Sequence, residues 1–464
     1  MENTPTQFKD HARESASDRH LRETVRKATT HSLQKRSAVV AEVPDWEELR
    51  QRGHDIRRQS IENLDVYLDR FEHQCLEHGI EVQWASTALE ACEHVVRILV
   101  STNSRHIVKS KSMVTEEIGL NRYLEQKGYE TVETDLGEYI VQLAGETPSH
   151  ITAPALHKSR EDIGKLFSEK LNVPLTHDPS QLTKYARNIL REKFLQADVG
   201  ISGANFLTAD TGTIVIVENE GNACLTTSLP KTHIVITGIE KVVPALQDAV
   251  TLLKLLPRSA TGQVTTSYVS FINSPRKPGD ADGPEKLIVI LVDNRRSEIL
   301  QNPEMRESLY CIRCGACMNV CPVYQTVGGH AYGSTYPGPI GSVVTPLMTS
   351  LQDAKALPFA STLCGACSEI CPVKIDIHHL LLRLRFQTVE QHLNSLGESL
   401  VIRLWQIGMR NDRLYAFLSK LSRIMFRGKP TIPIWSRERE APKLAPKTFH
   451  ELWKSEGLAE QDES

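Results

Sequence analysis

The sequence lacks several features that would assign it to common classes of protein. Its strongest apolar runs, residues 287–292 and 214–217, are far shorter than the roughly 18 residues that indicate a membrane-spanning helix. Its net charge of −3 at pH 7 gives no reason to expect binding to nucleic acid. Residues 1–27 are polar and charged, without the apolar core of a signal peptide, so we expect a cytoplasmic protein.

Two motifs of redox enzymes are also missing. No G-x-G-x-x-G follows an expected strand, so no Rossmann-type flavin or nicotinamide site is indicated. No C-x3-C-x2-C run is present, so a radical-generating cluster is not indicated either. Outside residues 311–371 cysteine is scarce, and Cys75, Cys92 and Cys224 are expected to be small buried apolar residues. A hydride acceptor is therefore expected elsewhere, or binds here without a recognisable motif, and the remaining seven cysteines are the candidates for redox chemistry in this chain.

Four of these seven form one run with a characteristic spacing. Cys311, Cys314, Cys317 and Cys321 are followed by Pro322, which gives C-x2-C-x2-C-x3-C-P. This spacing is typical of bacterial ferredoxins, whose thiolates hold iron–sulfur clusters. In two-cluster ferredoxins the fourth cysteine ligates the other cluster. A second run is therefore expected.

The second run aligns with the first position by position and has one cysteine fewer. Its residues Ser361, Cys364, Cys367 and Cys371 correspond to Cys311, Cys314, Cys317 and Cys321. Crossed ligation then predicts two [4Fe–4S] clusters. Cluster 1 takes Cys311, Cys314, Cys317 and Cys371, and cluster 2 takes Cys321, Cys364 and Cys367.

Cluster 2 lacks a cysteine for its fourth corner, which leaves three alternatives. It is a [3Fe–4S] cluster, a [4Fe–4S] cluster with a non-cysteine ligand, or a cluster whose open iron binds substrate. We favour the second, with Ser361, a water or a residue of a partner as the ligand. Zinc fits poorly because it prefers four tetrahedral ligands, usually in paired C-x2-C units. Disulfides fit less well still, because nothing suggests secretion.

Four segments are expected along the chain. Residues 1–55 form a polar, partly ordered N-terminal arm, and residues 56–297 form an α/β domain. Residues 298–396 form the cysteine module, in which helices flank both runs as in helical ferredoxins. Residues 397–464 form a basic helical tail, whose candidate helix at 400–427 could dock a partner, lie on an anionic membrane or pack on its own domain.

The α/β domain is predicted from alternating helix-like and strand-like segments. Such alternation is typical of a mainly parallel sheet. Helices are expected over residues 61–78, 85–100, 116–126, 181–196 and 244–256. Strands are expected over residues 80–84, 107–109, 129–134, 139–143, 199–201, 213–217, 233–237, 265–272 and 287–292.

Loops at the strand ends of this domain are candidates for a ligand-binding crevice. Lys109 and Lys111 end a strand just before a helix, where an anion can be held. The turns at 210–213 and 220–222 lie beside strands, although their glycines also suit ordinary tight turns. Other candidates have simpler explanations: Glu117, Asp135 and Glu138 as helix-face or turn carboxylates, and His330 as a surface residue or a group that tunes or ligates cluster 2.

Several longer motifs make the chain resemble the lactate-utilization iron–sulfur protein family over roughly residues 60–430. They lie at residues 109–113 and 116–121, 133–143, 203–213, 220–224 with 229–233, 328–333 and 336–341. The resemblance implies a sugar-isomerase/CoA-transferase-like α/β domain. It also implies a three-protein system that oxidises L-lactate to pyruvate. The family shares the seven cysteines, so Ser361 is not a departure from its pattern.

These observations favour an electron-transfer subunit of an L-lactate oxidoreductase complex. Iron–sulfur clusters pass single electrons, and two clusters suit a relay for a two-electron oxidation. Its expected partners are the other subunits of the system and an electron acceptor, with the inner face of the membrane as one place of contact. The alternatives are a hydro-lyase-like enzyme that uses the open iron of cluster 2, and a protein that senses redox state or iron.

Overall fold

A computed structural model describes residues 4–425 and 445–455 of the chain. The chain divides into two compact units, Met1–Glu390 and Gln391–Ser464. Within the described ranges, none of the helices has the length and apolar character needed to cross a bilayer.

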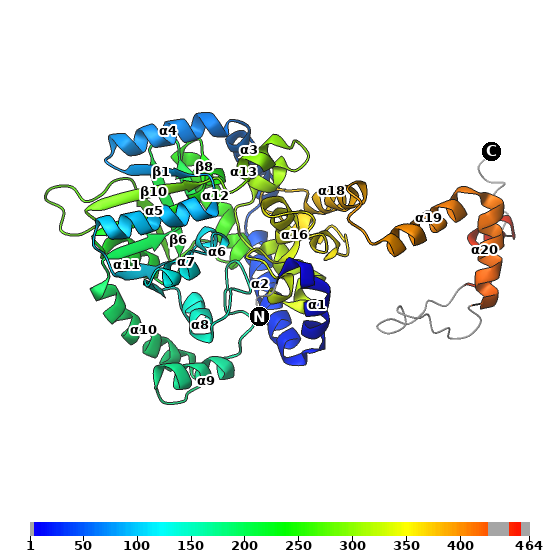
Figure 1. Cartoon of the computed structure of the whole chain (residues 1–464), viewed down its shortest axis with the longest axis horizontal. Helices are drawn as coiled ribbons and strands as arrows, with labels where there is room; N and C mark the ends of the chain where they lie inside the picture. The colour runs from blue at the N-terminus through cyan, green and yellow to red at the C-terminus, as the bar shows by residue number, and fades with distance from the viewer. Residues whose placement is uncertain (1–3, 426–444, 456–464) are drawn as a thin grey trace. The chain divides into compact units, whose positions relative to one another are not determined.

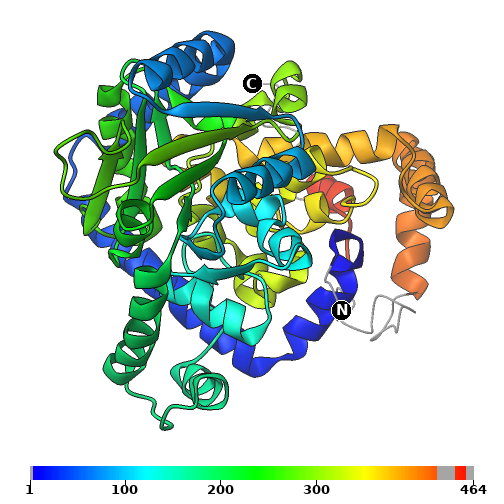
Figure 2. The same cartoon turned by 60° about the vertical axis from the view of Figure 1, so that its left-hand side comes forward.

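The first unit is built on a six-stranded sheet in which all neighbouring strands are parallel. In spatial order the strands are β1 (Glu81–Ala85), β10 (Lys286–Val292), β7 (Thr232–Gly238), β4 (Val199–Ser202), β2 (His106–Lys109) and β3 (Glu130–Glu133). Central strands such as β10 are apolar on both faces, because helices cover both sides of a parallel sheet. The predicted α/β class with a mainly parallel sheet is confirmed (Figure 2).

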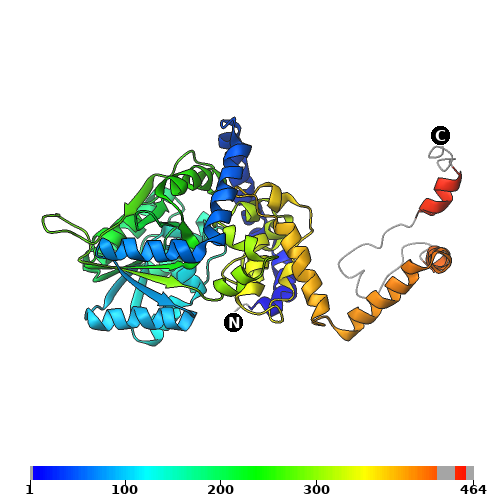
Figure 3. The ribbon, with the colours of Figure 1, turned by 90° about the horizontal axis from the view of Figure 1, so that it is seen from above.

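Helices cover the two faces in distinct groups. One face packs against α5 (Ala88–Ser101), α6 (Met113–Glu117) and α7 (Leu120–Gln126). The other packs near β3 against α8 (Leu136–Ala144), α9 (Arg160–Leu171) and α10 (Pro179–Gln196), and near β10 against α4 (Leu64–Glu77). Figure 3 shows α4 and α5 on opposite sides of the strands.

A second, four-stranded sheet extends the domain. Its order is β8 (Val242–Val243), β5 (Phe206–Thr208), β6 (Thr213–Glu218) and β9 (Tyr268–Ile272), with β6 antiparallel to both neighbours. Helices α11 (Asn222–Ser228) and α12 (Leu246–Ala260) and the 3-10 turn η2 (Ile239–Lys241) complete this part of the domain.

Two local predictions in this domain are wrong. Residues 139–143, expected as a strand, belong to helix α8, because the Asp135 side chain accepts from the backbone N–H groups of Gly137 and Glu138 and caps a helix. The helix expected over 116–126 is two helices, because Gly119 adopts a left-handed φ of 66° between them.

The N-terminal segment also differs from the expected partly ordered arm. It forms α1 (Phe8–Ser17), α2 (Arg19–Ala41) and α3 (Trp46–Glu62), and α2 packs on two helices of the cysteine module. The sequence does not indicate this packing, because the buried positions of these helices are few and include the side chains of Arg50 and Arg57. A search for an apolar face misses a helix that buries guanidinium groups.

The cysteine module is helical, as predicted, and adjoins the α/β domain within the first unit (Figure 1). It comprises α13 (Arg296–Gln301), η3 (Arg306–Tyr310), α14 (Ala316–Val320), α15 (Pro322–Val327), α16 (Gly338–Met348), α17 (Ala366–Glu369) and α18 (Ile377–Glu390). Three short 3-10 turns complete the unit: η1 (Pro5–Gln7), η4 (His330–Tyr332) and η5 (Leu357–Phe359).

The second unit consists of helices in the part that the structure describes. They are α19 (Leu396–Arg410), α20 (Asp412–Met425) and α21 (Phe449–Ser455). The single helix expected over 400–427 is interrupted at Asn411, which has extended dihedral angles (φ −124°, ψ 113°). Its last two expected residues lie outside the described ranges.

Candidate metal centre

Four cysteines from both runs line one cavity. Cys311, Cys314 and Cys317 come from the segment between η3 and α14, and Cys371 comes from the segment after α17. Apolar side chains complete much of the wall, including Ile151, Ile312, Ile340, Val373, Ile375 and Ile377. Burial raises the pKa of the Cys371 thiol to about 12, so a cationic metal core is needed to hold such thiols as thiolates.

The other three cysteines influence one another electrostatically. Burial, together with the charges of Cys321 and Cys364, raises the pKa of the Cys367 thiol to about 11. Cys321 and Cys367 are buried, whereas Cys364 is exposed. Among the remaining cysteines, Cys75 and Cys92 are buried as expected, but Cys224 is exposed on α11.

The spacing of the seven sulfur atoms disfavours zinc. Tetrahedral zinc with Zn–S bonds of about 2.3 Å brings its sulfur ligands to about 3.8 Å from one another. In the described part of the chain, the groups of three or more ligand atoms that all lie within 4.8 Å contain no cysteine. The cysteines therefore surround a wider space, which suits a multi-iron cluster better than a single ion.

The two runs adopt matching backbone conformations. Gly315 and Gly365 have left-handed φ values of 76° and 81°, and the residues before Cys314 and Cys364, Arg313 and Leu363, have 59° and 54°. The backbone N–H of Arg313 donates to the sulfur of Cys311 at 3.4 Å. That of Leu363 donates to the hydroxyl oxygen of Ser361 at 3.1 Å. Ser361 thus takes the local place of Cys311 in structure as well as in sequence.

Arginines of the N-terminal helices bind the backbone around the first cavity. Arg50 donates to the carbonyl oxygens of Cys371 and Glu369, and Arg36 donates to that of Ile370. The fully buried Arg57 donates to the carbonyl oxygens of Leu309 and Tyr310, just before Cys311. No pattern in the sequence predicts these contacts, which join positions more than 250 residues apart.

Several predicted candidates have structural partners. Lys109 is buried, with its Nζ 2.8 Å from Glu133 and 3.2 Å from Glu116, so it does not face a ligand crevice. Glu117, expected on a helix face, has a side chain that is only 7% exposed and that forms an ion pair with Arg296 at 2.8 Å. In the turn over residues 210–213, the Asp210 carboxylate accepts a hydrogen bond from the N–H of Leu246, the first residue of α12, and so helps to cap that helix.

Two more candidates are enclosed in the domain. Asp135 caps α8 and lines a pocket described below. Glu138 is buried on the same helix, and burial together with Glu133 and Glu116 raises the pKa of its carboxyl.

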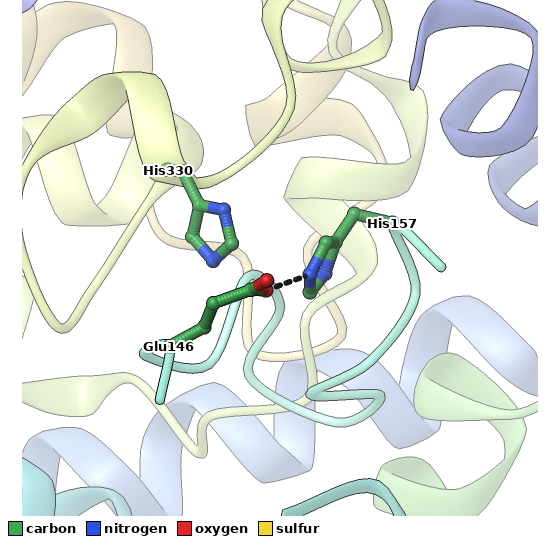
Figure 4. Close-up of side chains that lie close together, drawn as sticks. All are labelled: Glu146, His157 and His330. Carbon is green, nitrogen blue, oxygen red and sulfur yellow. Dashed lines mark hydrogen bonds and ion pairs between the residues drawn. The ribbon is translucent and has the colours of Figure 1, made fainter. Parts of the chain in front are cut away.

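His330 is half-buried and belongs to a polar group on the loops between the domains (Figure 4). Its Nε2 donates to the carbonyl oxygen of Thr147 at 2.7 Å, and its ring lies 4.5 Å from that of His157. His157 contacts the Glu146 carboxylate at 2.6 Å, and Lys158 contacts the same group. These contacts fasten the loop after α15 to the α/β domain, so His330 is not the surface residue that we expected.

A second cavity, which we call the sheet-edge pocket, lies next to the cysteine cavity. It has a volume of about 260 Å³ and shares Ile151 and Arg313 with the cysteine cavity. Its walls come from the turns after β2, β3 and β4, the start of α11, and the cysteine module. Lys111 and residues 218–220 and 222 line it, in partial agreement with the predicted crevice. Lys241, Arg313 and Tyr336 line it too and were missed, because only tertiary packing brings them there.

Three family models match successive parts of the chain. Residues 68–292 match the model of the LUD domain, residues 307–375 that of the 4Fe-4S dicluster domain, and residues 389–458 that of the C-terminal region of lactate utilisation protein B. A solved structure of a DUF162 family protein from Deinococcus radiodurans has 16% identity, covers 50% of this chain and 98% of its own, and gives a TM-score of 0.29.

Curated relatives match along nearly the whole chain. The chain is 43% identical to lactate utilization protein B of Bacillus cytotoxicus over 98% of both chains. It is 42% identical to the protein of the same name from Geobacillus kaustophilus, also over 98% of both. It is 44% identical to that from Anoxybacillus flavithermus over 91% of this chain and 92% of the relative.

Proposed function

Because the chain belongs to the lactate utilization protein B family, we propose that it is the iron–sulfur electron-transfer subunit of a system that oxidises L-lactate to pyruvate. The observation that carries this proposal is the cavity lined by Cys311, Cys314, Cys317 and Cys371. A cubane bound there and a second one at Cys321, Cys364 and Cys367 supply one-electron chemistry.

The surroundings of the cysteines support a relay from the interior to the surface. The first cavity is lined largely by apolar side chains, and arginines of α2 and α3 bind the backbone at Ile370 and Cys371. Cys364, in contrast, is exposed, so cluster 2 lies nearer the solvent. We assign the entry of electrons to cluster 1. Cluster 2 then passes them to a partner protein or another acceptor.

For cluster 2 we propose the hydroxyl oxygen of Ser361 as the fourth ligand. Its place next to the N–H of Leu363 matches the place of Cys311 next to the N–H of Arg313. The hydro-lyase alternative is less well supported, because the sheet-edge pocket adjoins the cavity with four cysteines and not the group with an open corner. A hydride acceptor and the remaining subunits are expected to come from partner proteins.

The proposal is tested on protein purified without oxygen. Iron, acid-labile sulfide and zinc are measured, followed by electron paramagnetic resonance (EPR) before and after reduction. We expect seven to eight irons with matching sulfide, as two clusters require. We also expect L-lactate to reduce the clusters only when the partner proteins are present. Zinc without sulfide would overturn the proposal, and reduction of the isolated chain by lactate would overturn the role of a pure relay.

A further inference from the structure

The sheet-edge pocket is lined by two buried cations, one without an ion-pair partner among the described residues and one whose ion pair is long. Lys241 is buried, and in the described part of the chain its Nζ makes no hydrogen bond or ion pair. Arg313 is also buried, its Nη1 has no hydrogen-bond partner there, and its nearest carboxylate oxygen, on Glu240, is 3.9 Å from Nη2. Lys109 shows the contrast, because its buried Nζ has two carboxylate partners.

Buried cations outnumber buried carboxylates around these two side chains. Four buried cations share two buried carboxylates: Arg57, Lys241, Arg296 and Arg313 against Glu117 and Glu240. Arg57 is satisfied by backbone carbonyl oxygens, and Arg296 is paired with both carboxylates. The thiolates of cluster 1 offset part of this positive charge on the side of the cysteine cavity. On the side of the sheet-edge pocket the Nζ of Lys241 has no anionic partner within ion-pair distance among the residues that the structure describes, and an anion bound there would offset the cost of burying it.

The carboxylates that line the same pocket are engaged elsewhere. Asp135 accepts from the N–H groups that start α8, and Glu218 accepts from those of Ala223 and Cys224. Glu220 accepts from the N–H of Leu136. Asp135 and Glu218 thus close local turns, and Glu220 joins its loop to the start of α8. None of the three lies within ion-pair distance of Lys241 or Arg313.

We propose that the sheet-edge pocket binds a small 2-hydroxy or 2-oxo carboxylate, whose carboxylate group is held by Lys241 and Arg313. The pocket volume of about 260 Å³ leaves room for such an acid together with water. Lys111 supplies a further cation, and Ser110 and Asn205 supply neutral polar groups for the second oxygen function. The choice of acid rests on the proposed function in lactate oxidation, whereas the anion site rests on the buried Lys241, which has no ion-pair partner in the described part of the chain, and on Arg313 beside it.

An acid bound in the sheet-edge pocket should change the redox potential and the EPR spectrum of cluster 1. Arg313 lies between Cys311 and Cys314 in sequence and lines both cavities. A carboxylate next to its guanidinium would offset positive charge beside the cluster and stabilise the oxidised form. The acid should therefore lower the midpoint potential of cluster 1 and alter its EPR spectrum without reducing it.

The test uses full-length protein with intact clusters and no partner proteins. Equilibrium dialysis measures the binding of L-lactate, pyruvate, acetate and inorganic phosphate. We expect saturable binding of lactate or pyruvate at one site per chain, tighter than that of acetate or phosphate. Lys241→Met should weaken it about tenfold or more, because one charge-assisted contact is lost. Lys184→Gln, at an exposed position on α10, should leave it unchanged.

Two results would overturn the binding site itself, and a third would reject its assignment to a carboxylate. One is the absence of saturable binding of either acid to protein whose iron and sulfide contents are complete, which would leave the electron-transfer proposal standing. The other is equal binding by the Lys241→Met and Lys111→Gln variants and the wild type. Tighter binding of phosphate than of both acids would also reject the carboxylate assignment. A change in the EPR spectrum of cluster 1 on adding the acid supports it independently of any activity.

Discussion

Arg50 on α3 holds the carbonyl oxygen of Cys371, which lies 321 positions further along the chain. Its Nε donates at 3.0 Å and its Nη2 at 2.7 Å, and Nη2 also donates to the carbonyl oxygen of Glu369 at 2.6 Å. Its Nη1 is paired with Glu47 on the same helix. The N-terminal helices therefore fix the position of the cysteine that the second run contributes to the first cavity.

Removing this guanidinium should shift cluster 1 to lower potential. A cation stabilises the more negative, reduced cluster, so Arg50→Gln should lower the midpoint potential of cluster 1 by about 60 mV, the equivalent of one charge-assisted hydrogen bond. Arg50→Lys keeps the charge but cannot donate in the same forked geometry, so it should speed iron loss with a smaller change in potential. Redox titration followed by EPR measures both.

The matched control is Arg58→Gln on the same helix. Arg58 is half-exposed and forms a surface ion pair with Asp55 at 3.2 Å, which contributes little to stability. An equal drop in potential for the Arg58 and Arg50 variants would mean that overall charge, and not the contact with Cys371, sets the effect.

Changes at Ser361 should affect cluster 2 alone. Ser361→Ala removes the hydroxyl oxygen and should increase the [3Fe–4S] signal in air-exposed protein, because the fourth iron is then held only by water. Ser361→Cys restores a full set of thiolates and should suppress that signal. EPR of the two variants, prepared side by side, measures the difference. Spectra identical to the wild type in both variants would exclude Ser361 as a ligand.

The buried pair of Glu240 and Arg296 should stabilise the fold with a defined pH dependence. Burial by itself raises the pKa of the Glu240 carboxyl, but Arg296, Lys241 and Arg313 outweigh burial and lower this pKa to about 2. The unfolded value is about 4.3, so the stabilisation is complete above that pH and is lost as the pH falls towards 2.

Glu240→Gln should therefore destabilise the protein by about 3 kcal/mol at pH 7, because it breaks a buried ion pair. Thermal unfolding of wild type and variant should differ by the same amount from pH 8 to pH 5. The matched control is Glu298→Gln, whose carboxylate pairs with Arg295 at the surface and is more than half exposed. A difference that shrinks between pH 8 and pH 5 would contradict the lowered pKa of Glu240.

The sequence predicted what depends on short-range spacing. The parallel sheet and the helical module, which the structure confirms, follow from alternation and motif spacing, which are local properties. The choice of the seven cysteines as cluster ligands rests on the same kind of local spacing and stays a prediction. The strand expected at 139–143 failed because its apolar residues suit either a strand or a buried helix, and the deciding contact was the Asp135 cap.

The rest depends on contacts between distant segments. The packing of α2 and α3 on the cysteine module rests on arginines that bond to backbone carbonyl oxygens, which leave no apolar pattern. Lys241 and Arg313 are ordinary charged residues in the sequence, 72 positions apart, and only the fold places them in one pocket beside the cysteines. Unpaired buried cations become visible only in three dimensions.

The central claim is that the two runs exchange their last cysteines. EPR of reduced, anaerobic Cys371→Ser and Cys367→Ser proteins, with iron and sulfide determined on the same samples, tests it most directly. The crossed arrangement predicts that Cys371→Ser damages cluster 1 and spares cluster 2, although the residue lies in the second run, whereas Cys367→Ser does the reverse. Loss of cluster 2 alone in the Cys371→Ser protein would contradict the crossed arrangement and the assignment of the four-cysteine cavity to one cluster.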